Sequence, residues 1–475
     1  MADFSSIFFS SITEINAKLR AKDFSAVELT RAFCDRIERI APQYNALALS
    51  LRKRALKQAH DVDDDLKRDR TRGPLQGIPY GAKDLLAVRG EPTTWGAQPL
   101  AKQVFDEDAA VIEKLDKTGA ILTSKLAMVE LAGGGDYRFA AASHTGPGLN
   151  PWDRTRWSGG SSSGSAAAVA AGLVTFALGS ETSGSIITPA AFCGVTGLRP
   201  TYGLVSRRGA MALSWTLDKI GPICHSVEDC ALVLHVIAGK DLEDPSSAGR
   251  GFPYNPEYAR KPSDLTIGYA PVDFNEWADA AIRPALQEAL RVVKALGFQT
   301  KEVEIPDFPH GAIVGTIIAG EAGSIFEDFI RSGKVDQLAD QAQIAGLKAS
   351  LDLPAVEYLR AMRVRTLVQE AFRTLFLDVD MLLAPARLDV APSASEPLDT
   401  PRTGQRPSSR GLNGLIAAGN LAGLPALSLP CGFANGLPVG ISLVGRPFYE
   451  SQIVAAGTAF QSQTDWHRRK PPIAE

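Results

Sequence analysis

Apolar residues at helical spacing open the chain, and strand-like and helical patterns then follow one another. The motifs S11-I-T-E14 and S25-A-V-E28 each place a serine three residues before a glutamate, ahead of apolar residues at helical spacing. This pattern is typical of a capping box at the start of a helix. It predicts helices within residues 1–60. Farther along, V227-E-D-C-A-L-V-L-H-V-I-A-G239 predicts an amphipathic helix that ends at Gly239.

The second half of the chain alternates between strand and helix patterns. Residues 265–270 and 299–305 predict strands, and residues 277–295 predict a helix between them. Such alternation is typical of an α/β layer arrangement. Residues 310–376 are mostly helical and rich in alanine, and we expect this region to face the substrate. A loop at 386–412, rich in proline, serine and arginine, precedes the C-terminal strands; loops of that length are usually functional or mobile.

Two loops dense in serine and glycine are the most informative feature of the chain. W157-S-G-G-S-S-S-G-S165 and G179-S-E-T-S-G-S185 flank an apolar segment. Residues 166–171 of that segment predict a thin, buried helix, and a flexible linker would not continue into such an apolar run. Hydroxyls and backbone N–H groups at a helix N-terminus can stabilise an oxyanion. The pattern therefore favours acyl-transfer chemistry.

Other glycine-rich motifs fit this segment less well. The order G-x-G-x-x-G is missing and no G-x-x-x-x-G-K-[ST] occurs, which argues against nucleotide binding. Residues 160–164 do match G-x-S-x-G with Ser162 at the centre, the pattern of a Ser-His-acid hydrolase. That alternative needs a histidine base. Spacing does not exclude His225 or His310, so it remains open.

Lys83 is the candidate base if no histidine serves. It follows a G-I-P-Y-G turn and precedes two leucines, a setting that predicts partial burial. Burial disfavours the ammonium form and lowers the pKa of a lysine, so that the amine can act as a base near neutral pH. Taken alone, however, Lys83 is better explained as an ordinary surface lysine.

Together these motifs resemble the amidase signature family. The segments around Lys83, the two serine-rich loops and N420-L-A-G-L-P occur in the family's order, and the resemblance covers residues 10–460. It implies a single α/β domain over residues 1–475, with a mixed, twisted central sheet covered by helices on both faces. The catalytic motifs then occupy residues 75–205.

The resemblance implies a Ser-cisSer-Lys triad. Ser185 matches the nucleophile, Ser161 matches a relay serine that follows a cis peptide bond, and Lys83 matches the base. The implied reaction is hydrolysis of a carbon–nitrogen bond through an acyl-enzyme on Ser185. Backbone N–H groups would stabilise the oxyanion. The residues that match this oxyanion hole are Thr182, Ser183 and Gly184.

The chain departs from the family pattern beside the triad. Glu181 stands where the family usually has an aspartate, and Ile187 stands where an arginine is common. Ser183 and Ser163 replace glycines. We expect Ser162 and Glu181 to stabilise the segments that carry the triad without contacting the substrate. Glu181 would accept hydrogen bonds from Ser162, from backbone groups or from another arginine. These departures leave the triad residues unchanged.

One position separates the branches of the family. The A subunit of the glutaminyl- and asparaginyl-tRNA-forming amidotransferase hydrolyses glutamine in a complex with B and C partner subunits. It carries an aspartate where this chain has Asn413, and an amide cannot form the same charge-assisted bond to an ammonium. We therefore expect a stand-alone hydrolase of acyl amides, anilides and carbamates, with side activity on esters. A catalytically silent binding protein of amidase ancestry and the glutamine-hydrolysing amidotransferase subunit remain alternatives.

Candidate substrate-binding residues come from variable segments near the motifs. Met128, Gly133 and Gly134 lie in one such segment, and Asn413 directly follows the 386–412 loop. Arg365 could hold a substrate carboxylate, or it could be a solvated charge on a helix.

Composition limits the kinds of binding partner and the cellular compartment that we expect for this protein. A net charge of -3 gives no basic field for nucleic acid, and neither a membrane-spanning run nor a secretory signal is evident. Five scattered cysteines without a C-x-x-C pair indicate a reducing compartment and no structural zinc. We expect a cytoplasmic monomer or homodimer that acts on a small-molecule amide, with no nucleic acid or membrane partner, no cofactor and no metal.

Overall fold

The computed structural model describes residues 4–258, 260–399 and 415–473. In this part of the chain, eleven strands form one sheet in the order β1-β3-β2-β6-β8-β7-β12-β13-β11-β9-β10. These strands are β1 (Leu47–Ser50), β2 (Pro79–Lys83), β3 (Ile121–Leu126), β6 (Phe176–Glu181), β7 (Thr196–Arg199), β8 (Lys219–Cys224), β9 (Thr266–Tyr269), β10 (Gln299–Glu302), β11 (Met381–Pro385), β12 (Ala426–Ala434) and β13 (Leu437–Gly445). A separate two-stranded sheet joins β4 (Leu149–Asn150) to β5 (Asp153–Trp157).

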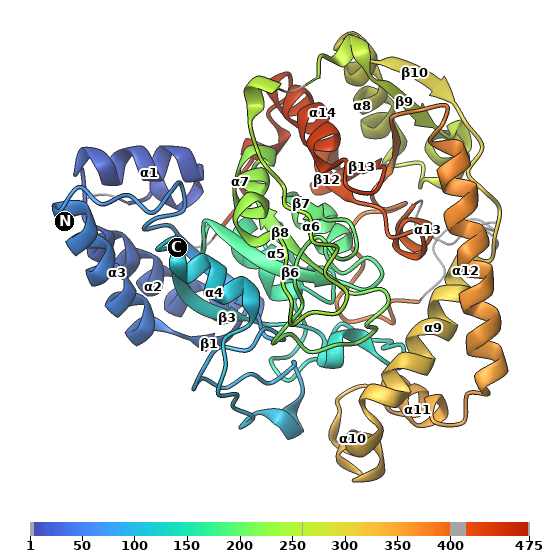
Figure 1. Ribbon diagram of the computed structural model, residues 1–475, viewed down its shortest axis with the longest axis horizontal. Helices are drawn as coiled ribbons and strands as arrows, with labels where there is room; N and C mark the ends of the chain where they lie inside the picture. The colour runs from blue at the N-terminus through green and yellow to red at the C-terminus, as the bar shows by residue number, and fades with distance from the viewer. Residues whose placement is uncertain (1–3, 259, 400–414, 474–475) are drawn as a thin grey trace.

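Helices surround this sheet. They are α1 (Ile12–Ala21), α2 (Ala26–Ile40), α3 (Arg52–Lys67), α4 (Ala110–Lys117), α5 (Ser163–Ala170), α6 (Ile187–Cys193), α7 (Val227–Ile237), α8 (Arg283–Ala295), α9 (His310–Ile325), α10 (Glu327–Arg331), α11 (Gln341–Ser350), α12 (Ala355–Leu375), α13 (Ile416–Leu421) and α14 (Glu450–Ser462). Figure 1 shows α1, α2 and α3 at one end of the molecule and α9 to α12 at the other. No helix of the described residues has the length and apolar character needed to cross a membrane.

Side chains that alternate along the central strands are buried on both faces of the sheet. Phe176 and Leu178 of β6 belong to the same apolar cluster as Ile453 of α14. Ala177, between them, belongs to a second cluster with Ala167 of α5. Because successive side chains of a strand point to opposite faces, helices cover the sheet on both sides. The predicted α/β fold is confirmed.

The sheet is mixed because parallel units meet an antiparallel hairpin. β2 runs parallel to both β3 and β6, and β9 runs parallel to both β10 and β11. The hairpin β12–β13 lies between these units, antiparallel to β7 and to β11. Its turn uses Asn435 and Gly436, both with positive φ, as a type I′ hairpin turn requires.

Local sequence signals explain several helix boundaries. Ser11 and Ser25 form the predicted capping boxes at the starts of α1 and α2. The helix predicted over 277–295 begins later, at Arg283, because Pro284 occupies its first turn and proline favours that position. The 310–376 region folds into α9 to α12, as its composition indicated. The 386–412 loop is described only as far as residue 399.

Candidate active site

Lys83 ends β2 inside the protein. Its Nζ lies 2.7 Å from Ser161 Oγ and 2.9 Å from Ser180 Oγ, and the side chain is fully buried. Burial lowers the pKa of Lys83 to about 7, although Asp218 and Glu181 act in the opposite direction. A large part of the amine is therefore unprotonated near neutral pH, as a general base must be.

Ser161 lies in the loop between β5 and α5. The peptide bond between Gly160 and Ser161 is cis, and the Ser161 side chain is buried beside Lys83. Gly159, just before this bond, has a φ of 88°. A Cβ at Gly159 would lie 2.6 Å from Pro189 Cα, so only glycine lets this loop approach α6 so closely.

Ser185 lies on the short turn between β6 and α6, with 8% of its surface exposed. Within the described part of the chain, the backbone N–H groups of residues 182–185 donate to no protein group. The next two N–H groups, of Ile186 and Ile187, both donate to Glu181 Oε2, at 2.8 and 3.0 Å. Glu181 therefore holds the turn while the four preceding N–H groups stay available to an oxyanion.

Glu181 also belongs to a buried charge cluster behind the turn. Its Oε1 accepts hydrogen bonds from Arg199 and from Asn420, each at 2.8 Å, and Asn420 Oδ1 accepts one from Lys219 at 2.6 Å. Burial alone would raise the pKa of Glu181, but Arg199, Lys219 and Asn420 outweigh burial and lower it to about 2. Of the partners expected for Glu181, the structure provides backbone groups and an arginine. Ser162 instead bonds to the backbone of Ser180.

The hydrogen bonds of Ser162 do not suit a nucleophile. Its Oγ donates to the Ser180 carbonyl at 3.2 Å and accepts from the Ser180 N–H at 3.3 Å, and the side chain is fully buried. None of its hydrogen bonds within the described ranges involves a histidine. His225 instead packs against the ring of Phe9. This geometry speaks against the Ser162-centred hydrolase.

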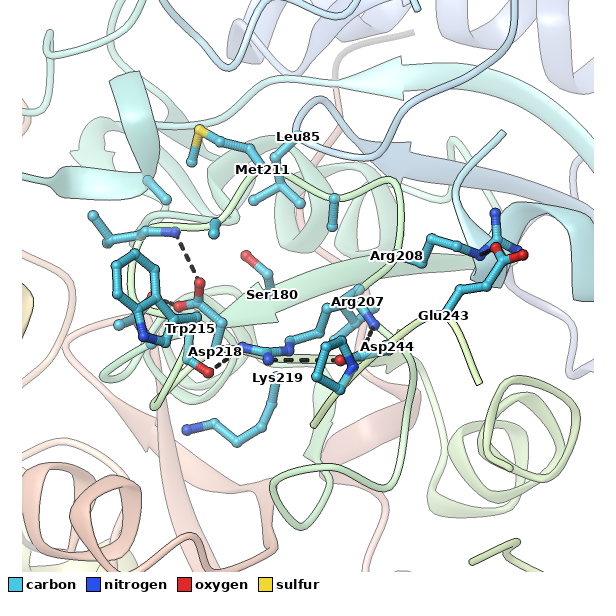
Figure 2. Close-up of a pocket in the computed structure, with 17 residues that line it drawn as sticks. Leu85, Ser180, Arg207, Arg208, Met211, Trp215, Asp218, Lys219, Glu243 and Asp244 are labelled. Carbon is cyan, nitrogen blue, oxygen red and sulfur yellow. Dashed lines mark hydrogen bonds and ion pairs between the residues drawn. The ribbon is translucent and has the colours of Figure 1, made fainter. Parts of the chain in front are cut away.

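A cavity of about 190 Å³ opens beside the turn between β6 and α6. Ser180 and Thr182 line it from β6 and the turn, and Asp218 lines it from the start of β8. Thr182 Oγ1 donates to Asp218 Oδ1 at 2.5 Å. Figure 2 shows Trp215 at one side of the cavity and the Arg208–Glu243 ion pair at the other, with Ser180 between them. The site therefore combines a buried lysine of lowered pKa, a turn with unpaired N–H groups among the described residues, and an adjoining cavity.

The predicted substrate-binding residues lie apart from this cavity. Met128 is fully buried. The space beside Gly133 is filled by the Tyr137 ring, and the space beside Gly134 by Leu213. None of Met128, Gly133 and Gly134 lines the cavity, although Ala132 of the same segment does. Asn413 lies outside the described residues.

Arg365 is buried rather than solvated. Its Nε donates to the Leu421 carbonyl and its Nη2 to the Thr216 carbonyl, each at 2.9 Å. Burial lowers the pKa of the guanidinium from its ordinary value. The side chain thus joins α12 to α13 and to the loop before β8, and its role toward a substrate stays a prediction.

Sequence reasoning missed three side chains that shape the site: Ser180, Arg199 and Asp218. A polar Ser-Glu pair ends the otherwise apolar strand β6, and this was the available signal. Because neighbouring side chains of a strand point to opposite faces, Ser180 reaches Lys83 while Glu181 reaches Arg199. Arg199 and Asp218 carry no comparable local signal.

Comparison with known sequences corrects the expected function. The A subunit of glutamyl-tRNA(Gln) amidotransferase from Carboxydothermus hydrogenoformans is 37% identical over 98% of this chain and 100% of its own length. Further relatives with the same name are 36% identical over 98% of this chain. The expectation of a stand-alone hydrolase of acyl amides, anilides and carbamates is therefore wrong. So is the expectation of a monomer or homodimer without a nucleic acid partner. The first expectation gave the single position Asn413 more weight than a similarity that extends over the whole chain, and the absence of a nucleic acid partner was inferred from the net charge of -3.

Solved structures and a family model agree on the family. The A subunit of glutamyl-tRNA(Gln) amidotransferase from Thermotoga maritima superimposes with a TM-score of 0.83 at 28% identity, covering 100% of both chains. A structure from a vestigial protein complex that reveals the origins of an s-triazine catabolic enzyme superimposes with a TM-score of 0.88 at 31% identity, covering 96% of this chain and 98% of that one. The family model described as Amidase matches residues 28–454. The broader expectation of an amidase-type enzyme agrees with these matches, and the chain belongs to the amidase signature family.

Proposed function

We propose that this chain is the glutamine-hydrolysing A subunit of an aminoacyl-tRNA amidotransferase. One observation carries the proposal: the relatives that share its full length at 36–37% identity bear the name of that subunit. The chemistry of the site supports it, because hydrolysis of a carboxamide needs a nucleophile, a base near neutral pKa and an oxyanion site. In such a complex the released ammonia serves to amidate a glutamyl group carried by tRNA.

In the proposed mechanism, the unprotonated amine of Lys83 accepts the proton of the Ser161 hydroxyl. Ser161 in turn takes the proton of Ser185 as Ser185 Oγ attacks the carboxamide carbon. The 2.7 Å separation of Lys83 Nζ and Ser161 Oγ suits the first transfer. The N–H groups of residues 182–185 stabilise the negative charge on the carbonyl oxygen, and one such donor is worth about 3–4 kcal/mol.

Collapse of the tetrahedral intermediate expels the amide nitrogen. The same relay, from Lys83 through Ser161, returns the proton to that nitrogen, which leaves as ammonia rather than as an amide anion. Water then attacks the acyl carbon while Lys83, through Ser161, takes a proton from that water. The bond to Ser185 Oγ breaks, the proton returns to this oxygen, and glutamate leaves the free enzyme. Ser180, the second partner of the Lys83 amine, holds that amine in place through both half-reactions.

The experiment is release of ammonia from glutamine, measured with the chain alone and with its co-purified partner subunits. We expect glutaminase activity that depends on Ser185 and increases when the partners are present. Ser185→Ala should abolish it, whereas Ser462→Ala, a matched change at the exposed end of α14, should retain it. Failure to hydrolyse glutamine with partners bound would overturn the proposal.

The structural match to the s-triazine-related complex favours a second candidate. In it, the same triad would belong to a complex that cleaves a carbon–nitrogen bond of a compound in s-triazine breakdown. Ser185-dependent ammonia release from such a compound, with none from glutamine, would support the second candidate over the first.

A further inference from the structure

Trp215 lines two cavities. It lines both the space beside Ser180 and Thr182 and a space of about 390 Å³ bounded by α9 and α12. With 41% of its surface exposed, its indole forms no hydrogen bond to any residue within the described ranges. Large exposed aromatic rings beside a catalytic cavity are typical of ligand-binding surfaces.

One buried carboxylate holds the residues on both sides of Trp215. Glu321 Oε2 accepts a short hydrogen bond from the Ser214 hydroxyl and another, at 3.2 Å, from the Thr216 N–H. Its other oxygen accepts from the Tyr358 hydroxyl at 2.9 Å, and Glu321 is 1% exposed. The backbone on either side of the indole is thereby fixed to α9 and α12.

Close packing of the two helices brings Tyr358 within reach of this carboxylate. A Cβ at Gly320, the residue before Glu321, would lie 2.8 Å from the Tyr358 ring. Burial raises the pKa of Tyr358 to about 12, and its hydrogen bond to Glu321 adds to the effect. The phenol therefore keeps its proton and remains a donor to Glu321 across the physiological pH range.

Asp218 connects the segment before Trp215 to the turn between β6 and α6. The N–H groups of Leu213 and Ser214 donate to Asp218 Oδ2 at 2.8 and 2.9 Å, and the other oxygen of Asp218 accepts from Thr182. The Trp215 carbonyl accepts from the Tyr202 hydroxyl at 2.6 Å. A fixed backbone thus presents a free indole at a defined position relative to Thr182.

We infer that Trp215 is a specificity-determining residue that contacts the substrate. Glu321 is the positioning residue that fixes the backbone on both sides of the Trp215 indole. The ligand that fits is an amide whose aliphatic chain or flat carboxamide packs on the indole face. The side chain of glutamine has both features, so this inference rests on the proposed function for the identity of the substrate. The contact itself rests on the geometry of Trp215, Glu321 and Asp218.

The first test compares Trp215→Ala and Trp215→Phe in the complex with partner subunits. Loss of the ring should raise the KM for glutamine about tenfold while kcat stays within about threefold, and phenylalanine should restore most of the difference. Trp466→Phe, which lines neither cavity, is the matched control. Unchanged KM in both Trp215 variants would overturn the inference, and so would a fall in kcat alone.

The positioning role has its own test. Glu321→Gln keeps the size of the side chain but weakens its hydrogen bonds to Ser214 and Thr216. It should raise KM about threefold or more without changing kcat, and Tyr358→Phe should act in the same direction more weakly. A kcat loss with constant KM in Glu321→Gln would show that Glu321 does not act through the indole, and would overturn its assignment.

A covalent probe separates failure of this inference from failure of the proposed function. The rate of Ser185 labelling by a fluorophosphonate with a long alkyl tail is compared with that by one bearing a small group. If Trp215 contacts the acyl portion, Trp215→Ala should slow only the long-tailed probe, by about tenfold. Equal effects on both probes would overturn the contact even in a protein that hydrolyses no glutamine.

Discussion

Lys83 Nζ and Ser161 Oγ lie 2.7 Å apart, and both side chains are buried. Lys83 belongs to the sheet and Ser161 to the loop before α5, so the contact joins segments 78 residues apart in sequence. Their burial matters because it disfavours the ammonium form of the lysine. The relay proposed for the site depends on this pair.

The first prediction concerns pH. The pKa of Lys83 is lowered to about 7 by burial, and the unprotonated amine is the reactive form. The value of kcat/KM for glutamine should therefore fall about tenfold per pH unit below that pKa and level off above it. A rate profile of the complex with partner subunits measures this. An activity that is independent of pH through neutrality would show that another group is the base.

The second prediction concerns Ser180, the partner of Lys83 that sequence reasoning missed. Ser180→Ala removes the hydroxyl 2.9 Å from Lys83 Nζ and leaves the amine free to turn away from Ser161. We expect kcat to fall about 10–100-fold with little change in KM, because the contact affects proton transfer rather than binding. Steady-state kinetics with Ser180→Thr, which keeps a hydroxyl, is the control. Full activity of Ser180→Ala would contradict the assigned role.

The third prediction concerns the buried pair of Glu181 and Arg199. Their side chains are 0% and 1% exposed and meet at 2.8 Å. Glu181→Gln leaves the guanidinium without its counter-charge and should lower the free energy of unfolding by about 3–5 kcal/mol at neutral pH. Denaturant unfolding measures the loss. A stability within about 0.5 kcal/mol of the wild type would show that the pair is not needed for folding.

The same pair predicts a pH dependence of stability. The folded-state pKa of Glu181 is about 2, below its usual 4.5, so its stabilising contribution is complete above 4.5 and is lost as the pH falls through 2. The difference in unfolding free energy between wild type and Glu181→Gln should therefore shrink across that window. A difference that stays constant down to the acid limit would contradict the lowered pKa.

The fourth prediction concerns the contact between α11 and the glycine-rich loop after β3. A Cβ at Gly346 would lie 2.0 Å from the Gly135 carbonyl oxygen, so Gly346→Ala must displace the loop and should cost about 1–3 kcal/mol. Gly311→Ala, in a helix and with open space around it, should be neutral or stabilising. Thermal unfolding of both variants tests the packing. Equal melting temperatures would contradict it.

Sequence patterns predicted the structure correctly where residues close together in the chain determine it. The capping serines Ser11 and Ser25 marked two helix starts because a cap depends on residues within one turn. The two leucines after Lys83 predicted its partial burial, but the segment predicted as a G-I-P-Y-G turn lies partly in the buried strand β2. The mixed α/β architecture followed from the family resemblance.

The features of the site that the sequence did not predict depend on contacts between segments that are distant in the chain. Arg199 meets Glu181 only because β7 and β6 flank β8, and Asn420 reaches the same carboxylate from α13. The sequence left Arg365 open as a substrate-binding residue or a solvated helix charge, and the structure shows that α13 and the loop before β8 bury it. The expected substrate class failed for a related reason, because it relied on Asn413 alone whereas the similarity to amidotransferase subunits extends along the chain.

Every step of the proposed glutaminase reaction passes through an acyl-enzyme that Ser185 forms with glutamine. The most direct measurement is an acid quench of the complex during turnover, followed by peptide mass spectrometry to locate a γ-glutamyl ester. We predict the ester on Ser185 in the wild type and no ester in Lys83→Ala. An ester on Ser162, or ammonia release with Ser185 replaced by alanine, would show that Ser185 is not the nucleophile.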